Sequence, residues 1–270
     1  MIKCLAPWHS ILVRFNGDIV PDGVYRKRYG NVLESPLNTV LNSITASHTR
    51  ESFIQGHLPP ECESCALKEA SVGHSRRKFF KDILNPMLEN TNYSYTKTFN
   101  DIMFLEFNMS NICNLKCRMC NGISSSAWVK DELKLAKMNK DFQRPVDNPE
   151  FGYTNKSEQI IERLFEDPTP FKNLRYLSIK GGEPYMEPAN KTILKKFIDL
   201  GVAKHVTLDW TTNGTMVDEE VHELAKQYGH TKWTVSLEGT DSLYEYISCL
   251  LYTSDAADEG LGVDLGGRRI

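Results

Sequence analysis

Residues 102–120 read IMFLEFNMSNICNLKCRMC and combine an apolar run with three closely spaced cysteines. The run over 102–108 predicts a buried strand, and the loop after it carries Cys113, Cys117 and Cys120 in a C-x3-C-x2-C pattern. Three thiolates on one short loop can converge on a single inorganic cluster, because cysteine thiolates are the usual iron–sulfur ligands. Three ligands leave one iron of a cubane open to a small molecule. Zinc is the alternative, although structural zinc prefers four protein ligands.

From about residue 100 onward, predicted strands alternate with amphipathic helices. Further strands are predicted over 174–179, 206–211 and 233–237, and helices over 124–138, 157–165, 191–200 and 218–228. Gly201 and Gly229 follow two of these helices, as expected at the C′ position. Such alternation implies parallel strands joined by right-handed crossovers, with ligands at the carboxyl ends of the strands. The predicted fold class is therefore α/β.

The amino-terminal part reads as a small α+β metal-binding module over residues 1–80. Its predicted elements are a helix over 36–54 and two short strands, over 10–15 and 18–21, around the hairpin signal Asn16-Gly17. The module ends with Cys62 and Cys65 in a C-x2-C pattern. We interpret the polar stretch that follows as a linker over 81–99, before a core over 100–248.

Three further motifs follow the later strands of the core. Gly181-Gly182-Glu183-Pro184 follows the second strand, where glycines let backbone groups approach a ligand and Glu183 can accept from an ammonium group. Thr211-Thr212-Asn213-Gly214 closes the third strand, and Ser236-Leu237-Glu238-Gly239 closes the fourth. Each motif alone is also typical of ordinary turns, Asn-Gly especially.

With these motifs and the cysteine loop, residues 100–248 resemble the radical S-adenosylmethionine (SAM) superfamily. The resemblance implies a partial (β/α)6 barrel that is truncated at its carboxyl end. It implies that the cysteines of the loop hold a 4Fe-4S cluster. The residues expected to contact SAM are Gly181, Gly182, Glu183, Asn213, Ser236 and Met119. Met119 stands where the family usually has an aromatic residue near the adenine, and a flexible thioether can pack there instead.

The resemblance also implies a specific chemistry. The cluster would reductively cleave SAM to a 5′-deoxyadenosyl radical, which abstracts hydrogen from an unidentified peptide, protein or small metabolite. No catalytic residue is assigned beyond the cluster ligands. The expected partners are that substrate and a low-potential electron donor similar to flavodoxin or ferredoxin. The alternative is a non-catalytic regulatory or structural protein that binds zinc or an iron–sulfur cluster.

Cys4, Cys62 and Cys65 make the amino-terminal part resemble a twitch or SPASM module, which carries auxiliary iron–sulfur clusters. That module normally has one or two further cysteines just after the hairpin, where this chain reads Val20-Pro21-Asp22-Gly23. The three cysteines, with Asp22 or an external ligand, are candidate ligands of an auxiliary metal. A zinc site and a module that has lost its metal are the alternatives.

Composition and charge exclude several other classes of protein. The 270 residues carry a formal net charge of −3, so bulk charge does not draw the chain to nucleic acid or an anionic membrane. No apolar run reaches the roughly 18–20 residues of a bilayer span, and the first residues lack the pattern of a signal peptide. An odd number of cysteines, seven, argues against a disulfide framework. We expect a cytoplasmic protein.

Residues 249–270 resemble a translated sequencing adapter. The stretch is rich in Gly and Asp and has no apolar period that matches the sequence before it. We therefore expect no domain there, no ligand role for Cys249, and a different natural sequence after Ser248. A barrel cut after its fourth strand exposes an unpaired edge, so we expect the chain as written to be poorly soluble and weakly active or inactive.

Overall fold

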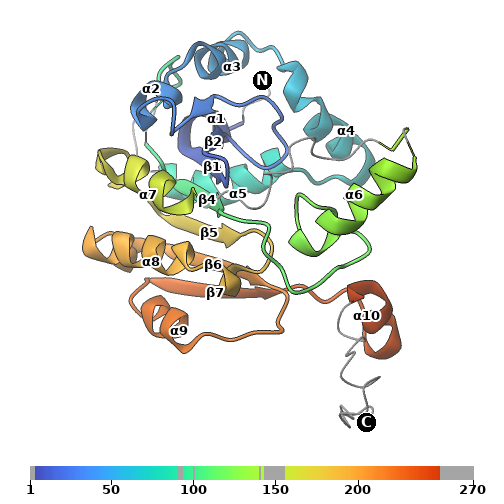
Figure 1. The fold of residues 1–270 in the computed structure, drawn as a ribbon. Coiled ribbons are helices and arrows are strands. Elements are labelled where there is room, and N and C mark those ends of the chain that lie inside the picture. The colour runs from blue at the N-terminus through green and yellow to red at the C-terminus, as the bar shows by residue number, and fades with distance from the viewer. Residues whose placement is uncertain (1–3, 90–93, 100, 140, 143–155, 250–270) are drawn as a thin grey trace, which may run out of the picture.

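A computed structural model of the chain describes residues 4–89, 94–99, 101–139, 141–142 and 156–249. Across this part of the chain, one seven-stranded sheet has the order β3-β2-β1-β4-β5-β6-β7 (Figure 1). The strands are β1 (Ser10–Arg14), β2 (Asp18–Val20), β3 (Gly30–Asn31), β4 (Phe104–Asn108), β5 (Tyr176–Lys180), β6 (Thr207–Thr212) and β7 (His230–Val235). Strand β1 and strands β4 to β7 run parallel, and β2 and β3 extend one edge in antiparallel pairing.

Helices pack around this sheet. The α-helices are α1 (Ala6–His9), α2 (Leu37–Leu41), α3 (Ile44–Ile54), α4 (Glu63–Val72), α5 (Arg76–Leu88), α6 (Val129–Met138), α7 (Ser157–Phe165), α8 (Ala189–Asp199), α9 (Glu219–Ala225) and α10 (Asp241–Ser248). Short 3-10 helices are η1 (Pro60–Cys62), η2 (Ser126–Trp128), η3 (Thr169–Phe171), η4 (Pro184–Met186) and η5 (Ala203–His205). Figure 1 shows α7, α8 and α9 stacked along β5, β6 and β7, with α2, α3 and α4 gathered around β1 and β2. This mixed, mostly parallel architecture confirms the predicted fold class.

The two faces of the sheet have different chemistry because alternate residues of a strand point to opposite sides. Leu105, Leu177 and Leu208 form one registered row and are completely buried in a core shared with residues of α7, α8 and α9. The next row is polar and points to the other side of the sheet. Its members are Glu106, Ser178, Asp209 and Lys232.

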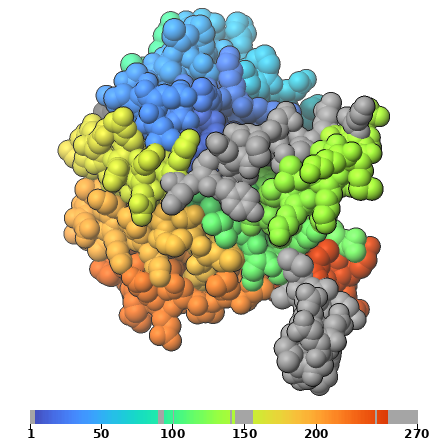
Figure 2. Space-filling view, viewed as in Figure 1, coloured from blue at the N-terminus to red at the C-terminus, as the bar shows by residue number. Residues whose placement is uncertain are grey.

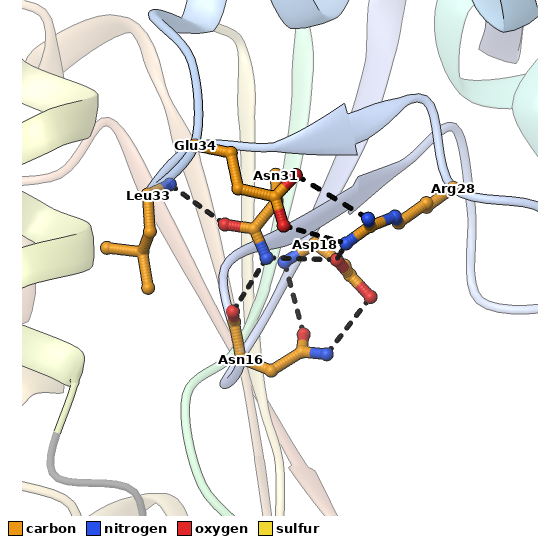
Figure 3. Close-up of polar contacts among 6 residues, drawn as sticks. All are labelled: Asn16, Asp18, Arg28, Asn31, Leu33 and Glu34. Carbon is orange, nitrogen blue, oxygen red and sulfur yellow. Dashed lines mark hydrogen bonds and ion pairs between the residues drawn. The ribbon is translucent and has the colours of Figure 1, made fainter.

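The predicted hairpin at Asn16-Gly17 is confirmed by antiparallel pairing of β1 with β2. Gly17 has φ +86°, a conformation that favours glycine. Asn31 fixes the turn, because its Nδ2 donates to the Asn16 carbonyl at 2.9 Å and to Asp18 Oδ1 at 3.0 Å (Figure 3). Arg28 adds an ion pair to Asp18 at 2.8 Å. These contacts hold β3, the edge strand of the sheet, against the hairpin.

The sheet runs across the predicted boundary between the two modules. Strand β1 pairs with β4 in parallel from Ser10↔Phe104 to Arg14↔Asn108, and Figure 2 shows the amino-terminal residues packed directly on the rest of the molecule. The predicted linker over 81–99 begins inside α5, whose Phe80 and Leu84 are completely buried. The sequence analysis missed this helix because charged residues and Pro86 stand among its apolar residues. Those apolar residues do recur at helical spacing, and they are Phe79, Phe80, Ile83, Leu84, Met87 and Leu88. The domain limits themselves stay predictions.

Most predicted element positions are confirmed, with shifts at their ends. The helix predicted over 36–54 is divided into α2 and α3, and β7 begins three residues before the predicted 233–237 strand. Gly201 follows α8 with φ +70°, as a C′ glycine should. Gly229 has a different role, since a Cβ there would lie 2.5 Å from the Lys204 carbonyl oxygen. It allows close packing of two chain segments.

The far edge of the sheet is open in the described part of the chain. There β7 pairs with β6 alone, and Trp233 and Val235 are 37% and 48% exposed. The expected poor solubility stays a prediction. Of the adapter-like stretch, only Cys249 lies within the described residues, at the end of α10, and 250–270 lie outside them. None of the described helices is long and apolar enough to cross a bilayer.

Candidate metal and cofactor site

The loops that follow β4, β5, β6 and β7 meet at the carboxyl edge of the sheet, as the parallel order requires. The cysteine loop contacts the glycine turn after β5, because the backbone N–H of Gly182 donates to the Ser110 carbonyl at 2.9 Å and that of Glu183 to Ile112 at 2.7 Å. It contacts the loop after β6 through Asn213, whose Nδ2 donates to Cys113 Sγ at 3.7 Å. The fold therefore gathers the separate motifs into one site.

The cysteine loop is held in place by hydrogen bonds to its carbonyl groups. Ser125 Oγ donates to the Leu115 carbonyl at 2.6 Å, and Trp128 Nε1 donates to the Cys117 carbonyl at 2.9 Å. Leu115 is only 2% exposed and anchors the loop in the interior. Cys120 N–H donates to the Cys117 carbonyl at 2.9 Å, which folds the end of the loop into a turn. The sequence analysis missed Ser125 and Trp128, because no spacing rule links them to the cysteines.

The three thiols of this loop lie close enough to influence one another's titration. Burial raises the pKa of Cys117 to about 11, and the neighbouring charges of Cys120, Glu238 and Cys113 add to the effect. Burial and Cys113 also raise the pKa of Cys120, and burial raises that of Cys113. Three thiolates together therefore need a cationic partner, and metal binding supplies one by displacing the protons. The donor set fits an iron–sulfur cluster.

Glu183 connects the turn after β5 to the end of β6. Its carboxylate is 1% exposed and accepts from Thr212 Oγ1 at 2.8 Å through one oxygen and from Asn213 N–H at 2.8 Å through the other. This fixes Asn213 beside the cysteine loop. A contact between the Glu183 side chain and an ammonium group stays a prediction, and the structure gives that side chain a positioning role.

Gly181 and Gly182 allow the turn to pack directly on the cysteine loop. A Cβ on Gly181 would lie 2.6 Å from the Ser110 carbonyl oxygen, and one on Gly182 would overlap the Ile112 carbonyl. Gly181 also has φ +143°, which L side chains rarely adopt. The glycines therefore allow the turn to approach the backbone of the cysteine loop closely. The predicted approach of the turn to a ligand stays a prediction.

The remaining predicted SAM contacts lie around the same edge. Asn213 Nδ2 donates to Asn114 Oδ1 at 2.9 Å, which links the loop after β6 to the cysteine loop a second time. Ser236 follows β7 and its N–H donates to the Thr212 carbonyl at 2.9 Å. Met119 is 57% exposed on the cysteine loop, so its thioether is accessible to a ligand. Their roles in binding SAM stay predictions.

A second group of cysteines lies in the amino-terminal module. Cys4, Cys62 and Cys65 line one cavity together with Asp22 and Arg77. Burial raises the pKa of Cys62 to about 12 and that of Cys4 well above its ordinary value. As at the loop, the thiols of Cys4 and Cys62 stay protonated unless a cation replaces the protons.

The turn between α4 and α5 supports this cavity. Gly73 ends α4 with φ +72°, and Ser75 caps α5 by accepting from Lys78 N–H at 3.2 Å. Glu69 accepts from Ser75 Oγ and forms an ion pair with Arg77, whose Nε donates at 2.9 Å. This ion pair lowers the pKa of Glu69 to about 2 and fixes Arg77 at the cavity wall.

Among the described residues, no three Cys, His, Asp or Glu side chains are close enough together to hold one metal ion. The ligands of an iron–sulfur cluster bind different iron ions, and are therefore spread around the cluster.

The fold is that of an α/β protein, and the candidate site at the carboxyl edge of its sheet is rich in thiols. Comparison with known families gives two matches. The radical SAM superfamily model matches residues 107–257, and the SPASM model, an iron-sulfur cluster-binding domain, matches residues 4–66. Since the first match covers more than half of the chain, the chain belongs to the radical SAM superfamily. The second confirms the resemblance of the amino-terminal part to a SPASM-like module. No curated protein matches the chain.

Proposed function

We propose that Cys113, Cys117 and Cys120 hold a 4Fe-4S cluster at which SAM binds and is reductively cleaved. The observation that carries this proposal is the position of the three thiols, on one anchored loop that touches the glycine turn after β5 and Asn213 after β6. When bound, the cluster and SAM together supply the one-electron chemistry that starts hydrogen abstraction from a substrate.

The residues of this chain would bind and orient the cofactor. Gly181 and Gly182 bring the turn against the cysteine loop, and Glu183 holds Asn213 beside it. We propose that the backbone of this turn, with Asn213 and Ser236, contacts SAM, and that Met119 packs on its adenine. A thioether suits that position because it is flexible and polarisable.

The polar face of the sheet would receive the substrate. Glu106 lies there between two cations, at 3.0 Å from Lys180 Nζ and 3.3 Å from Arg76 Nη2. On the next strands, Tyr176 donates to Asp209 at 2.9 Å. Charged groups held in this way can bind a polar peptide, protein side chain or metabolite. We propose a substrate of this polar kind.

The same proposal implies an electron donor and a cellular compartment. The enzyme would take electrons from a low-potential donor similar to flavodoxin or ferredoxin, and would work in the cytoplasm. We also propose that Cys4, Cys62 and Cys65 bind an auxiliary iron–sulfur cluster, because they line one cavity.

The test is metal and product analysis after anaerobic purification of the full chain. We expect iron and sulfide at both cysteine groups, and slow formation of methionine and 5′-deoxyadenosine from SAM after reduction, in keeping with the weak activity expected of this chain. Changing Cys113, Cys117 and Cys120 to Ala should remove about four iron ions per chain and all SAM cleavage. Cys249→Ala is the matched control and should change neither. Zinc in place of iron, or iron content unaffected by the triple change, would instead favour the non-catalytic alternative.

A further inference from the structure

The cavity in the amino-terminal module has an acidic wall as well as three thiols. Cys4 comes from the segment before α1, and Cys62 and Cys65 come from η1 and α4. Asp22 joins them from the loop after β2, and Arg77 lies at the same wall. Glu61 lines the cavity too, but it forms an ion pair with Lys27 at 4.0 Å. Five groups that can bind metal therefore converge from three separate parts of the chain.

Asp22 is held in this cavity by its own loop. Its Oδ1 accepts from the backbone N–H groups of Val24 at 2.7 Å and Tyr25 at 2.9 Å, and the residue is 7% exposed. Within the described residues, Oδ2 makes no hydrogen bond. One oxygen thus fixes the orientation of the carboxyl group, and the other is available to a ligand.

No side chain of the described residues forms an ion pair with Asp22. Arg77 is engaged by Glu69, and Arg76 by Glu106 at 3.3 Å. A buried carboxylate is costly unless it is paired or coordinates a metal. The surroundings of Asp22 therefore match those of a metal ligand in its metal-free state.

We propose that Cys4, Asp22, Cys62 and Cys65 form one four-ligand iron–sulfur site, in which Asp22 supplies an oxygen ligand through Oδ2. This inference rests on the auxiliary cluster proposed above and names its fourth ligand. Three thiolates and one carboxylate carry the same formal charge as four thiolates, so the cluster would keep the net charge that it has with four cysteine ligands. The iron bound to Asp22 differs from the other three, and its ligand changes the reduction potential of the cluster.

The experiment uses the full chain with Cys113, Cys117 and Cys120 changed to Ala, so that the auxiliary cluster is the one under observation. The chain is reconstituted anaerobically with isotopically enriched iron and sulfide, and is studied by Mössbauer spectroscopy and redox titration. We expect about four iron ions per chain, with about one quarter of the absorption in a separate component from the oxygen-ligated iron.

Asp22→Asn is the informative variant, because the amide oxygen can still accept from Val24 and Tyr25 while the carboxylate is removed. We expect this variant to lose about one iron per chain and the separate component, and to give the spectrum of a three-iron cluster. Asp22→Cys should restore about four irons, now equivalent in ligation, with a shifted reduction potential. Thermal unfolding of the metal-free variants checks that the fold is unchanged.

The possible results separate the two proposals. An Asp22→Asn spectrum identical to that of its parent would show an external fourth ligand and overturn this inference. Absence of iron in the parent, with iron in the unaltered chain, would refute the auxiliary cluster and leave the SAM site standing. If Asp22→Asn does not fold, an Asp22→Cys cluster with unchanged spectrum and potential would also overturn the inference.

Discussion

The two cysteine groups are built in opposite ways. Cys113, Cys117 and Cys120 follow one another on a single loop, and the hydrogen bonds from Ser125 and Trp128 fix that loop locally. Cys4, Cys62 and Cys65 are brought together only when α1, η1 and α4 pack around a common cavity.

Each group therefore depends on a different part of the chain. The local group needs its own loop and the carboxyl edge of the sheet. The distant group needs the core around Trp8 and Phe53, to which Phe104 of β4 and Tyr176 of β5 also belong, and the buried Arg50 beside it. Mutations can therefore disable one group and leave the other intact.

The largest expected effect is the loss of SAM cleavage in Cys117→Ala. Cys117 is half-buried and its carbonyl, not its thiol, holds the loop, so the free energy of unfolding of the metal-free chain should change by less than about 1 kcal/mol. Chromatography of the products measures SAM cleavage, and chemical denaturation measures the free energy of unfolding. Cys249→Ala should alter neither. Substantial 5′-deoxyadenosine formation by Cys117→Ala would contradict the proposal that the cysteine loop holds the cluster.

Arg50→Ala should instead lower the free energy of unfolding, and this loss of stability should be centred on the amino-terminal module. The Arg50 guanidinium is completely buried and donates to the carbonyls of Pro7, Leu41 and Lys97 at 3.0, 2.8 and 2.7 Å. Its loss leaves these carbonyls without that donor, at a cost of about 3 kcal/mol.

Chemical denaturation of the metal-free chain measures this loss, with the exposed Arg26→Ala as the matched control, expected within about 0.5 kcal/mol of the parent. Iron at the amino-terminal cysteines should fall more than iron at the cysteine loop. Equal loss at both would show that the two groups fold as one unit.

The same contrast explains what could be predicted from the sequence. Local signals, such as the C-x3-C-x2-C loop and the Asn16-Gly17 hairpin, were sufficient because their geometry depends on neighbouring residues. The parallel pairing of β1 with β4 was not predicted, because nothing local records which distant strand will lie alongside.

Within the site, the sequence predicted which motifs meet but not what each side chain contacts. Glu183 was expected to face a ligand, and the structure shows it hydrogen-bonded to Thr212 and Asn213. Such contacts arise from the spacing of β5 and β6 in the sheet. The helix α5 was missed although its apolar residues recur at helical spacing, because charged residues and Pro86 stand among them.

Gly182→Ala should disturb the cysteine loop from outside it. The new Cβ would overlap the Ile112 carbonyl, so the turn and the loop must move apart, at a cost of about 1–3 kcal/mol. SAM affinity should fall, while iron at Cys4, Cys62 and Cys65 stays unchanged. Gly56→Ala is the matched control, because its Cβ would meet no atom within 4 Å, although φ +81° there also disfavours Ala. Calorimetric titration with SAM measures the difference.

The smallest expected effect is a pH-dependent loss of stability in Glu69→Gln. The ion pair with Arg77 lowers the pKa of Glu69 to about 2, against about 4.3 in an unfolded chain. The carboxylate therefore contributes its full stability above about pH 4.3, and this contribution is lost as the pH falls through about 2. We expect Glu69→Gln to be less stable than the parent by about 1 kcal/mol or less near neutral pH, and equally stable below about pH 2. Denaturation of the metal-free proteins across this range tests it, and a difference independent of pH would assign the contribution of Glu69 to packing.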